Sequence, residues 1–199
     1  MERSVNTPTS SKLNLANNLS ILRIILVPFF VSALVYYTPQ NDWLRVAALC
    51  IFLVACITDA ADGYVARKFN QKTVFGEYID PIADKLLLLG GFLAMTFIDS
   101  LPETMRIPAW VTIAVITRDV VILVGSVIVF FATNTLKPDP LKVGKMTTFF
   151  QMMTLVLYLM QTSLWLKYTF CGVTLVLTLV SGIQYIRMGA RLIQPDPSR

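Results

Sequence analysis

Four aspartates lie close together in the sequence, where one hydrophobic stretch ends and the next begins. They are Asp59, Asp62, Asp80 and Asp84. A carboxylate at membrane depth costs about 2.5–3.5 kcal/mol on insertion scales, so four of them at one hydrophobic edge need a compensating interaction. The neighbouring residues do not offer four matched cations, whereas a divalent metal ion would balance the charge. The aspartates therefore predict a metal site.

The spacing of these aspartates indicates how they are positioned. On helices, the first two are i,i+3 neighbours and the last two are i,i+4 neighbours, so each pair shares one face. The stretch from Arg67 to Gly76 is a short link, so we expect the second and third helices of the chain to be antiparallel neighbours. The two pairs would then face one another at one depth. The alternative is a packing stripe of small residues beside a solvated acidic loop.

The residue types available restrict the kind of metal. The chain has no histidine, so neither an imidazole ligand nor an imidazole base is available. Hard oxygen ligands without histidine or thiolate favour magnesium, manganese or calcium over zinc. One or two such ions, kept partly hydrated, suit binding to the phosphates of a substrate. Gly63 and Ala66 leave backbone exposed where a phosphorylated ligand could approach.

The rest of the sequence is that of a membrane protein. Of its 199 residues, 55% are hydrophobic and only 15% are charged, and the mean hydropathy is +0.65. Six apolar runs reach or approach the length that a helix needs to cross a bilayer. We therefore expect an all-α, polytopic membrane protein, with six transmembrane helices in one bundle and a catalytic site at the cytoplasmic edge. The expected spans are 19–37, 43–58 continuing into the aspartate motif, 79–98, 107–132, 146–161 and 164–185.

The loop charges predict the orientation. Eleven lysines and arginines fall on the side that holds both termini and the motif loop, and three fall on the other side. By the positive-inside rule the termini and the motif are cytoplasmic. Trp43, Trp110 and Trp165 lie near the opposite ends of their spans, as an aromatic belt would. The net charge of +5 reflects this orientation and anionic lipid rather than nucleic acid.

These features together predict a single domain. We expect a multi-pass protein of a bacterial inner (cell) membrane, with a flexible N-terminal segment over residues 1–12. A membrane domain over 13–193 and a short C-terminal tail over 194–199 would follow.

The motif resembles a known family signature. The pattern D-x2-D-G-x2-A-R-x8-G-x3-D-x3-D, from Asp59 to Asp84, is similar at all eight fixed positions to that of the CDP-alcohol phosphatidyltransferase family (class I). The resemblance implies a six-helix membrane bundle that usually dimerises. It also implies an enzyme in which the hydroxyl of an acceptor alcohol displaces CMP from a CDP-linked lipid such as CDP-diacylglycerol.

The resemblance further implies roles for individual residues. The divalent ions, Mg²⁺ or Mn²⁺, would be held by Asp59, Asp62 and Asp80, with Asp84 as a further ligand and as the catalytic base. The segment from Asn17 to Arg23 is similar to the entry of the family's first helix, which places Asn17 near the nucleotide and Arg23 near the anionic site or in a structural tie. The CDP-lipid site would be lined by Asn17, Asp62, Gly63, Ala66, Arg67, Gly76 and Asp80.

Basic residues outside the motif suit an anionic acceptor. Arg118 lies within the fourth span and should face a cavity rather than lipid; the alternative is an ion pair with Asp119 or with the acidic motif. Together with Lys145 and Arg187 it forms the predicted acceptor phosphate site. For Arg187 and Arg191, contact with lipid headgroups is the alternative.

Several acceptor alcohols are compatible with these residues. Glycerol 3-phosphate fits, because the run from Asp80 to Lys85 is similar to the family's phosphatidylglycerophosphate synthases; inositol phosphate would also fit the charges. The run Arg118-Asp119-Val120 is closer to the family's cardiolipin synthases, whose acceptor is phosphatidylglycerol. We favour glycerol 3-phosphate. A divalent-cation transporter or a membrane scaffold is the alternative from another class, but a transporter site belongs near the bilayer midplane.

Overall fold

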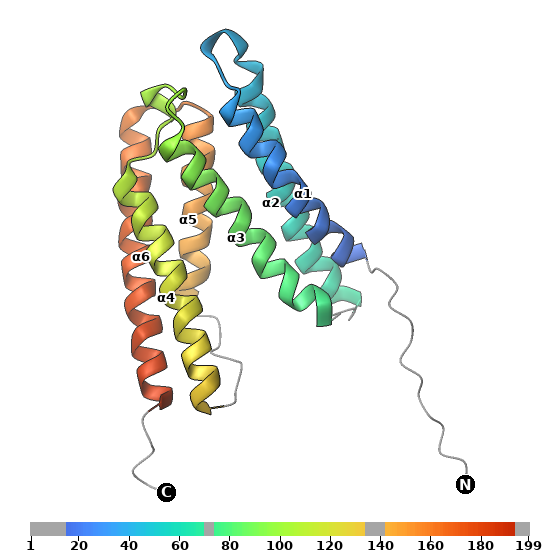
Figure 1. Ribbon diagram of the computed structural model, residues 1–199, viewed down its shortest axis with the longest axis vertical. Helices are drawn as coiled ribbons and strands as arrows, with labels where there is room; N and C mark the ends of the chain where they lie inside the picture. The colour runs from blue at the N-terminus through green and yellow to red at the C-terminus, as the bar shows by residue number, and fades with distance from the viewer. Residues whose placement is uncertain (1–14, 70–73, 134–141, 194–199) are drawn as a thin grey trace, which may run out of the picture.

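The computed structural model describes residues 15–69, 74–133 and 142–193, with side chains for 20–59, 83–129, 131 and 142–191. Within these ranges the chain is helical and contains no strand (Figure 1). Two short 3-10 helices, η1 (Pro39–Asn41) and η2 (Glu103–Met105), lie in the turns. The α-helices are α1 (Leu15–Val35), α2 (Trp43–Phe69), α3 (Val74–Phe97), α4 (Ala109–Thr133), α5 (Lys142–Leu159) and α6 (Leu164–Ile193).

The helices correspond in number and order to the six runs expected from the sequence. Their ends differ at the edge that carries the motif. There α2 continues to Phe69 and α3 begins at Val74, so both aspartate pairs lie within continuous helix. The last helix extends eight residues beyond its expected end at Tyr185, to Ile193. The expected flexible N-terminal segment, 1–12, and the expected short C-terminal tail, 194–199, lie outside the described residues.

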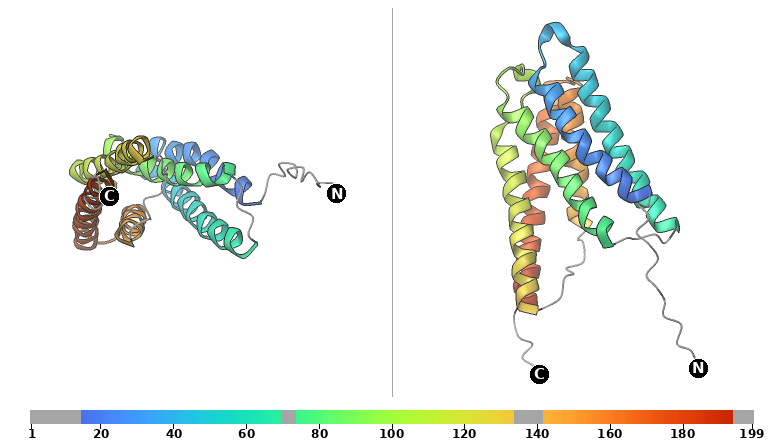
Figure 2. Two further views of the ribbon diagram at one scale, coloured as in Figure 1. Left: turned by 90° about the horizontal axis from the view of Figure 1, so that it is seen from below. Right: turned by 45° about the vertical axis from the view of Figure 1, so that its right-hand side comes forward.

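The first three helices pack mainly through α1. Helix α1 packs extensively against both α2 and α3, whereas among the described residues α2 and α3 share no extensive interface. The expected antiparallel course of the second and third helices is present (Figure 1), and along the described residues α1 contacts both of them. The short connection constrains only the distance between two helix ends, and it leaves room for a third helix to contact both. The other three helices form a second group, in which α6 packs against α4 and α5 (Figure 2).

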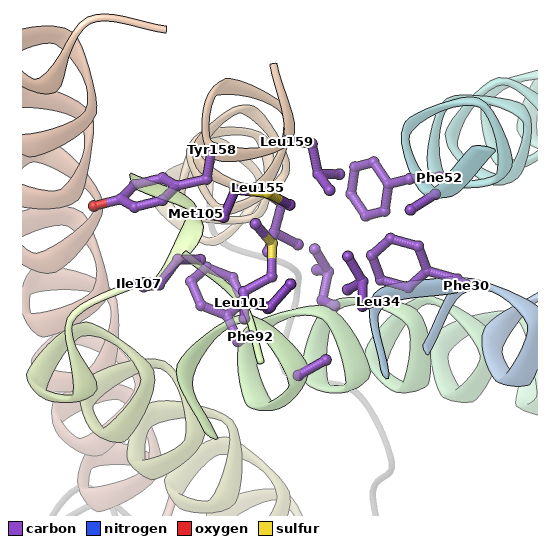
Figure 3. Close-up of a cluster of buried hydrophobic side chains, with 14 of the residues drawn as sticks. Phe30, Leu34, Phe52, Phe92, Leu101, Met105, Ile107, Leu155, Tyr158 and Leu159 are labelled. Atoms are coloured by element: carbon purple, nitrogen blue, oxygen red, sulfur yellow. The ribbon is translucent and has the colours of Figure 1, made fainter. Parts of the chain in front are cut away.

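One hydrophobic core joins the two groups. Phe30 of α1 and Phe52 of α2 lie with their ring centroids 5.6 Å apart, and Phe92 of α3 and Leu155 of α5 belong to the same cluster of buried side chains (Figure 3). The backbone N–H of Ile107 donates a 2.9 Å hydrogen bond to the Met95 carbonyl, which holds the η2 segment against this core. The two groups of helices thus share one core.

Besides this apolar core, several polar side chains are buried between the helices, and many large apolar side chains lie on the outer surface. The hydroxyls of Thr154 and Thr174 are 2.9 Å apart between α5 and α6, and the Thr147 hydroxyl donates to the Leu177 carbonyl at 3.2 Å. By contrast Phe131 and Trp165 are 79% and 77% exposed. Small and hydroxyl-bearing residues between helices, with apolar residues on the outer surface, are typical of helix packing in a bilayer.

Two stretches are long and apolar enough to cross a membrane among the described residues, Glu103–Val129 and Leu164–Arg191. A shorter apolar helix covers Ser20–Val35. Only 22% of each long window is buried, which distinguishes both from the core helix of a soluble domain, and neither lies at the N-terminus. We therefore treat the chain as a membrane protein.

The turn between α1 and α2 is held by an ion pair. The Arg45 guanidinium donates to both carboxylate oxygens of Asp42 at 2.7 and 2.6 Å, and its other terminal nitrogen donates to the Leu159 carbonyl at 2.9 Å. The hydrogen bonds from Arg45 lower the pKa of the Asp42 carboxyl below its ordinary value. This contact fixes the turn to the end of α5, at the end of the bundle opposite the aspartate motif.

Candidate active site

Helix α1 places one buried arginine between two of the motif aspartates. The side chain of Arg23 is only 1% exposed, and its Nη1 lies 3.1 Å from Oδ1 of Asp59 on α2. The same nitrogen donates to Oδ1 of Asp84 on α3. These carboxylates are 36% and 29% exposed. Because both contacts share one nitrogen, Asp59 and Asp84 come together from different helices, with Arg23 as their common partner.

The remaining motif residues belong to the same helix ends. Asp62 is three residues beyond Asp59 in α2, and Asp80 is four residues before Asp84 in α3. Their side chains lie outside the described part of the structure, as do those of Asn17, Gly63, Ala66, Arg67 and Gly76. The structure thus brings together one aspartate of each pair. Within the described residues, no three acidic, cysteine or histidine side chains are placed so that they could hold a metal ion together.

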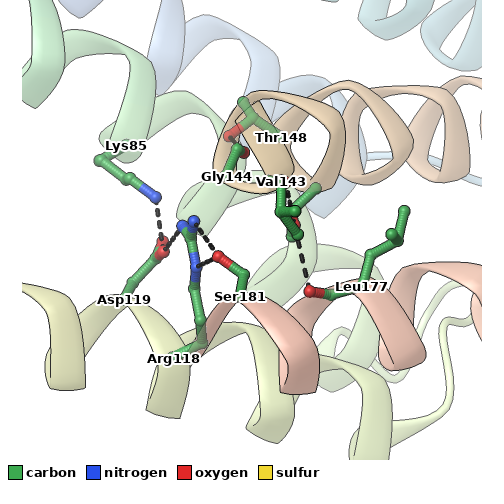
Figure 4. Close-up of polar contacts among 9 residues, drawn as sticks. Lys85, Arg118, Asp119, Val143, Gly144, Thr148, Leu177 and Ser181 are labelled. Carbon is green, nitrogen blue, oxygen red and sulfur yellow. Dashed lines mark hydrogen bonds and ion pairs between the residues drawn. The ribbon is translucent and has the colours of Figure 1, made fainter. Parts of the chain in front are cut away.

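A second polar cluster surrounds Arg118 (Figure 4). The Arg118 side chain is 6% exposed, and its Nη1 lies 2.8 Å from Oδ1 of Asp119. Its Nε and Nη2 donate to the Ser181 hydroxyl of α6 at 3.3 and 2.9 Å. Lys85 of α3 lies with its Nζ 2.5 Å from the same Asp119 oxygen. The ion pair with Asp119, the alternative role for Arg118, is therefore present.

The guanidinium of Arg118 is also enclosed by nonionic groups. Its Cζ lies 5.8 Å from the centre of the Tyr185 ring. Gly144 of α5 is also close to it, since a Cβ at this position would lie 3.2 Å from Nη2. Lys145, the next residue, is exposed, as is Arg187, two residues after Tyr185. Helices α4, α5 and α6 therefore meet at Arg118. Lys145 and Arg187, the other two basic residues predicted for the acceptor, follow closely in sequence after residues near Arg118.

The sequence as a whole matches one family. The sequence model of the CDP-alcohol phosphatidyltransferase family covers residues 13–181. The chain belongs to the CDP-alcohol phosphatidyltransferase family. It is thus an enzyme of the transferase class, which removes the transporter and scaffold alternatives.

Two relatives show how far the similarity extends. The "Probable phosphatidylglycerophosphate synthase" of Mycobacterium tuberculosis is 34% identical over 182 residues, covering 89% of this chain and 82% of the relative. The "CDP-diacylglycerol--glycerol-3-phosphate 3-phosphatidyltransferase" of Escherichia coli strain K12 is 36% identical over 184 residues, covering 87% and 93%. Both relatives therefore match this phosphatidyltransferase over nearly its whole length.

The described site residues fit the divalent metal ion on which this family generally depends. Asp59 and Asp84 supply oxygen donors, the ligand type that Mg²⁺ and Mn²⁺ prefer. Both carboxylates are partly exposed, so each retains accessible surface beside its contact with Arg23. Nitrogen and thiolate ligands of the kind that favour zinc are not part of this donor set.

Sequence reasoning missed several contacts of the Arg118 cluster. Ser181 and Tyr185 were not singled out, and Lys85 was not assigned to any site. A signal for Ser181 does exist in the sequence. The buried polar residues of α6 recur at helical spacing, at Thr174, Thr178 and Ser181, and such a stripe in an apolar helix predicts a face directed into a bundle.

Proposed function

We propose that this phosphatidyltransferase transfers the phosphatidyl group of CDP-diacylglycerol to glycerol 3-phosphate, giving phosphatidylglycerophosphate and CMP. One observation carries the proposal. Relatives named for this acceptor match the chain at 34–36% identity over 87–89% of its length. The family model, over residues 13–181, includes the aspartate motif and Arg118. The cationic character of that cluster supports the proposal, since a phosphate-bearing acceptor is an anion.

Asp84 is assigned as the general base. Its carboxylate is partly exposed at the end of the bundle that carries the motif. It accepts the proton of the attacking acceptor hydroxyl, and the hydroxyl oxygen forms a bond to the phosphorus that carries the diacylglycerol. The bond from that phosphorus to the CMP oxygen breaks, and CMP leaves with the electron pair. No Ser, Cys or His stands at a fixed position of the motif, so a single in-line displacement is favoured over a phospho-enzyme.

Arg23 orients this base. Its buried guanidinium donates to Asp84 and lies 3.1 Å from Asp59, so it limits the positions that both carboxylates can take. Arg23 is therefore a positioning residue.

The metal site is assigned to all four aspartates, Asp59, Asp62, Asp80 and Asp84. Bound Mg²⁺ or Mn²⁺ would neutralise the negative charge of the CDP-diacylglycerol diphosphate and of the departing CMP. The CDP-lipid is assigned to Asn17, Asp62, Gly63, Ala66, Arg67, Gly76 and Asp80. The acceptor phosphate is assigned to Arg118, Lys145 and Arg187.

We infer that the chain crosses a bacterial inner membrane six times, with both termini in the cytoplasm. This is the topology that the loop charges predict. The start of α1 and the end of α6 lie at the end of the bundle that carries the motif (Figure 1). Trp43, Trp110 and Trp165 all lie at or next to the first residue of their helices, at the other end, and all are exposed, as an aromatic belt requires. A homodimer and a single membrane domain over 13–193 complete this proposal.

Phosphatidylglycerol, the acceptor of a cardiolipin synthase, is the second candidate. An apolar groove of about 400 Å³ runs between α4 and α6, with Val121, Gly125, Val129 and Gly189 among its lining residues. Tyr185 lines the groove and also faces the Arg118 guanidinium. An acceptor lipid could place an acyl chain in this groove and its headgroup near Arg118.

CMP release tests the reaction class. Purified protein in detergent, given CDP-diacylglycerol and Mg²⁺ or Mn²⁺, should release CMP only when an acceptor is added. Chelation with EDTA should stop the release, and readdition of the metal should restore it. Absence of CMP release with glycerol 3-phosphate and with phosphatidylglycerol would contradict the proposal.

A further inference from the structure

One carboxylate oxygen in the Arg118 cluster contacts two cationic side chains. Oδ1 of Asp119 lies 2.5 Å from Nζ of Lys85 and 2.8 Å from Nη1 of Arg118, as Figure 4 shows. The lysine comes from α3 and the arginine from α4. Because both contacts end at the same atom, the two nitrogens lie within the span of a single phosphate group.

The two cations differ in how firmly they are held. Arg118 is 6% exposed and is fixed by Ser181, the Tyr185 ring and Gly144. The side chain of Lys85 is 43% exposed and its one ion pair within the described residues is with Asp119. Two positive charges and one negative charge leave the cluster with a net charge of +1. A second anion is therefore attracted to it, and Lys85 is free to turn toward that anion.

We propose that Lys85 is a further binding residue for the acceptor phosphate and that Asp119 is a positioning residue, which takes the place of that phosphate while the site is empty. This inference rests on the proposed function, because the phosphate is that of glycerol 3-phosphate. On binding, phosphate oxygens replace Asp119 as the partner of Lys85 and of one Arg118 nitrogen. No covalent bond changes.

The position of Lys85 gives this exchange a consequence for catalysis. Lys85 directly follows Asp84 in α3, and Asp119 directly follows Arg118 in α4. A phosphate held between Lys85 and Arg118 therefore brings the acceptor close to the helix turn that carries the proposed base. The cluster would thus orient the acceptor as well as bind it.

Two substitutions should shift acceptor binding in opposite directions. Asp119→Asn removes the competing carboxylate, so the KM for glycerol 3-phosphate and the Ki of inorganic phosphate should both fall at least threefold, while kcat also falls. Lys85→Gln removes a ligand, so both constants should rise at least fivefold, with the KM for CDP-diacylglycerol within twofold of wild type. Asp119→Glu keeps the carboxylate and should stay near wild type.

Asp99→Asn is the matched control, because Asp99 is a fully exposed partner of Arg106 in the loop between α3 and α4; it should change none of these constants. An unchanged or raised KM in Asp119→Asn, or an unchanged KM in Lys85→Gln, would overturn the inference. If Asp119→Asn fails to fold, Lys85→Gln decides alone.

Calorimetric titration with inorganic phosphate separates this inference from the proposed function. If the wild type does not use glycerol 3-phosphate but the two variants still shift phosphate affinity in opposite directions, the proposed acceptor is wrong and the anion site stands. If the wild type does use glycerol 3-phosphate and neither variant shifts the titration, the inference is wrong and the proposed function stands.

Discussion

Arg23 of α1 donates a hydrogen bond to Asp84 of α3 from an almost fully buried position. The first helix thereby contributes the cation for a carboxylate that lies 61 residues further along the chain. A motif that consists only of aspartates, glycines, an alanine and one arginine does not reveal this partner. The contact explains how two carboxylates from separate helices can be held together at a hydrophobic edge.

Replacement of Arg23 tests this relationship. Arg23→Met leaves Asp59 and Asp84 without their shared cation, and loss of one partner of a buried ion pair is strongly destabilising, by about 3–5 kcal/mol when both partners are buried. Because these carboxylates are partly exposed, we expect a smaller loss, seen as a lower Tm in detergent with EDTA.

The same variant should respond more strongly to metal. Added Mg²⁺ should raise the Tm of Arg23→Met more than that of wild type, since divalent cations take over the charge balance. Lys142→Met removes one exposed positive charge at the start of α5 and serves as the control. Equal Mg²⁺ responses in all three proteins would argue against a shared role for the carboxylates.

Asp84→Asn tests the assignment of the base. The amide keeps the size of the side chain but cannot accept the proton of the acceptor hydroxyl. Turnover should be abolished, while binding of CDP-diacylglycerol stays largely intact. The measurements are CMP release and binding of labelled CDP-diacylglycerol. A variant that keeps more than a tenth of the wild-type rate would rule out this role.

Gly144→Ala tests the placement of Arg118. The added Cβ would lie 3.2 Å from Nη2 of Arg118 and 3.6 Å from the Tyr185 hydroxyl, so the guanidinium must shift. We expect the KM for glycerol 3-phosphate to rise several-fold with little change in the KM for CDP-diacylglycerol. Gly172→Ala is the control, because a Cβ at Gly172 meets nothing within 4 Å. A KM that moves equally for both substrates would point to a general disturbance.

Two adjacent glycines of α3 test the packing of the bundle. A Cβ on Gly91 would lie 3.0 Å from Leu155 and 3.3 Å from Phe30, whereas one on Gly90 would make ordinary contacts of 3.4 and 3.5 Å with Val31 and Val27. Gly91→Ala should destabilise the protein by about 1–3 kcal/mol through overpacking.

Gly90→Ala should be neutral or stabilising, by up to about 1 kcal/mol, because alanine favours a helix over glycine. Thermal unfolding in one detergent compares the two variants. A Gly91→Ala protein as stable as Gly90→Ala would contradict the close approach of α1, α3 and α5.

Much of the fold could be predicted from the sequence because apolar length and loop polarity report directly on helices in a bilayer. The six helices were predicted in order, and the α2 start at Trp43 and the α6 start at Leu164 were predicted to the residue. The extension of α6 to Ile193 could not be predicted, because Arg187 and Arg191 end the apolar run but do not end the helix. The packing of the first three helices could not be predicted either, because the short link between α2 and α3 does not indicate that α1 contacts both of them.

The candidate site was predictable to the extent that its residues form a local pattern. Asp59 and Asp84 were singled out by their spacing. Arg118 was singled out because a charged side chain in an apolar helix carries a free-energy cost. Ser181 of α6 contacts Arg118 of α4, and Lys85 of α3 contacts Asp119 of α4, so both contacts join helices that are distant in sequence. No spacing rule within one helix connects such residues, so only the folded chain reveals them.

The acceptor is the most direct test of the proposed function. Purified protein should be given labelled CDP-diacylglycerol with equal concentrations of glycerol 3-phosphate and phosphatidylglycerol, and the lipid products should be resolved. We predict phosphatidylglycerophosphate as the dominant labelled product, with one CMP released for each molecule formed. Dominant cardiolipin, or CMP release that is indifferent to glycerol 3-phosphate, would contradict the proposed function.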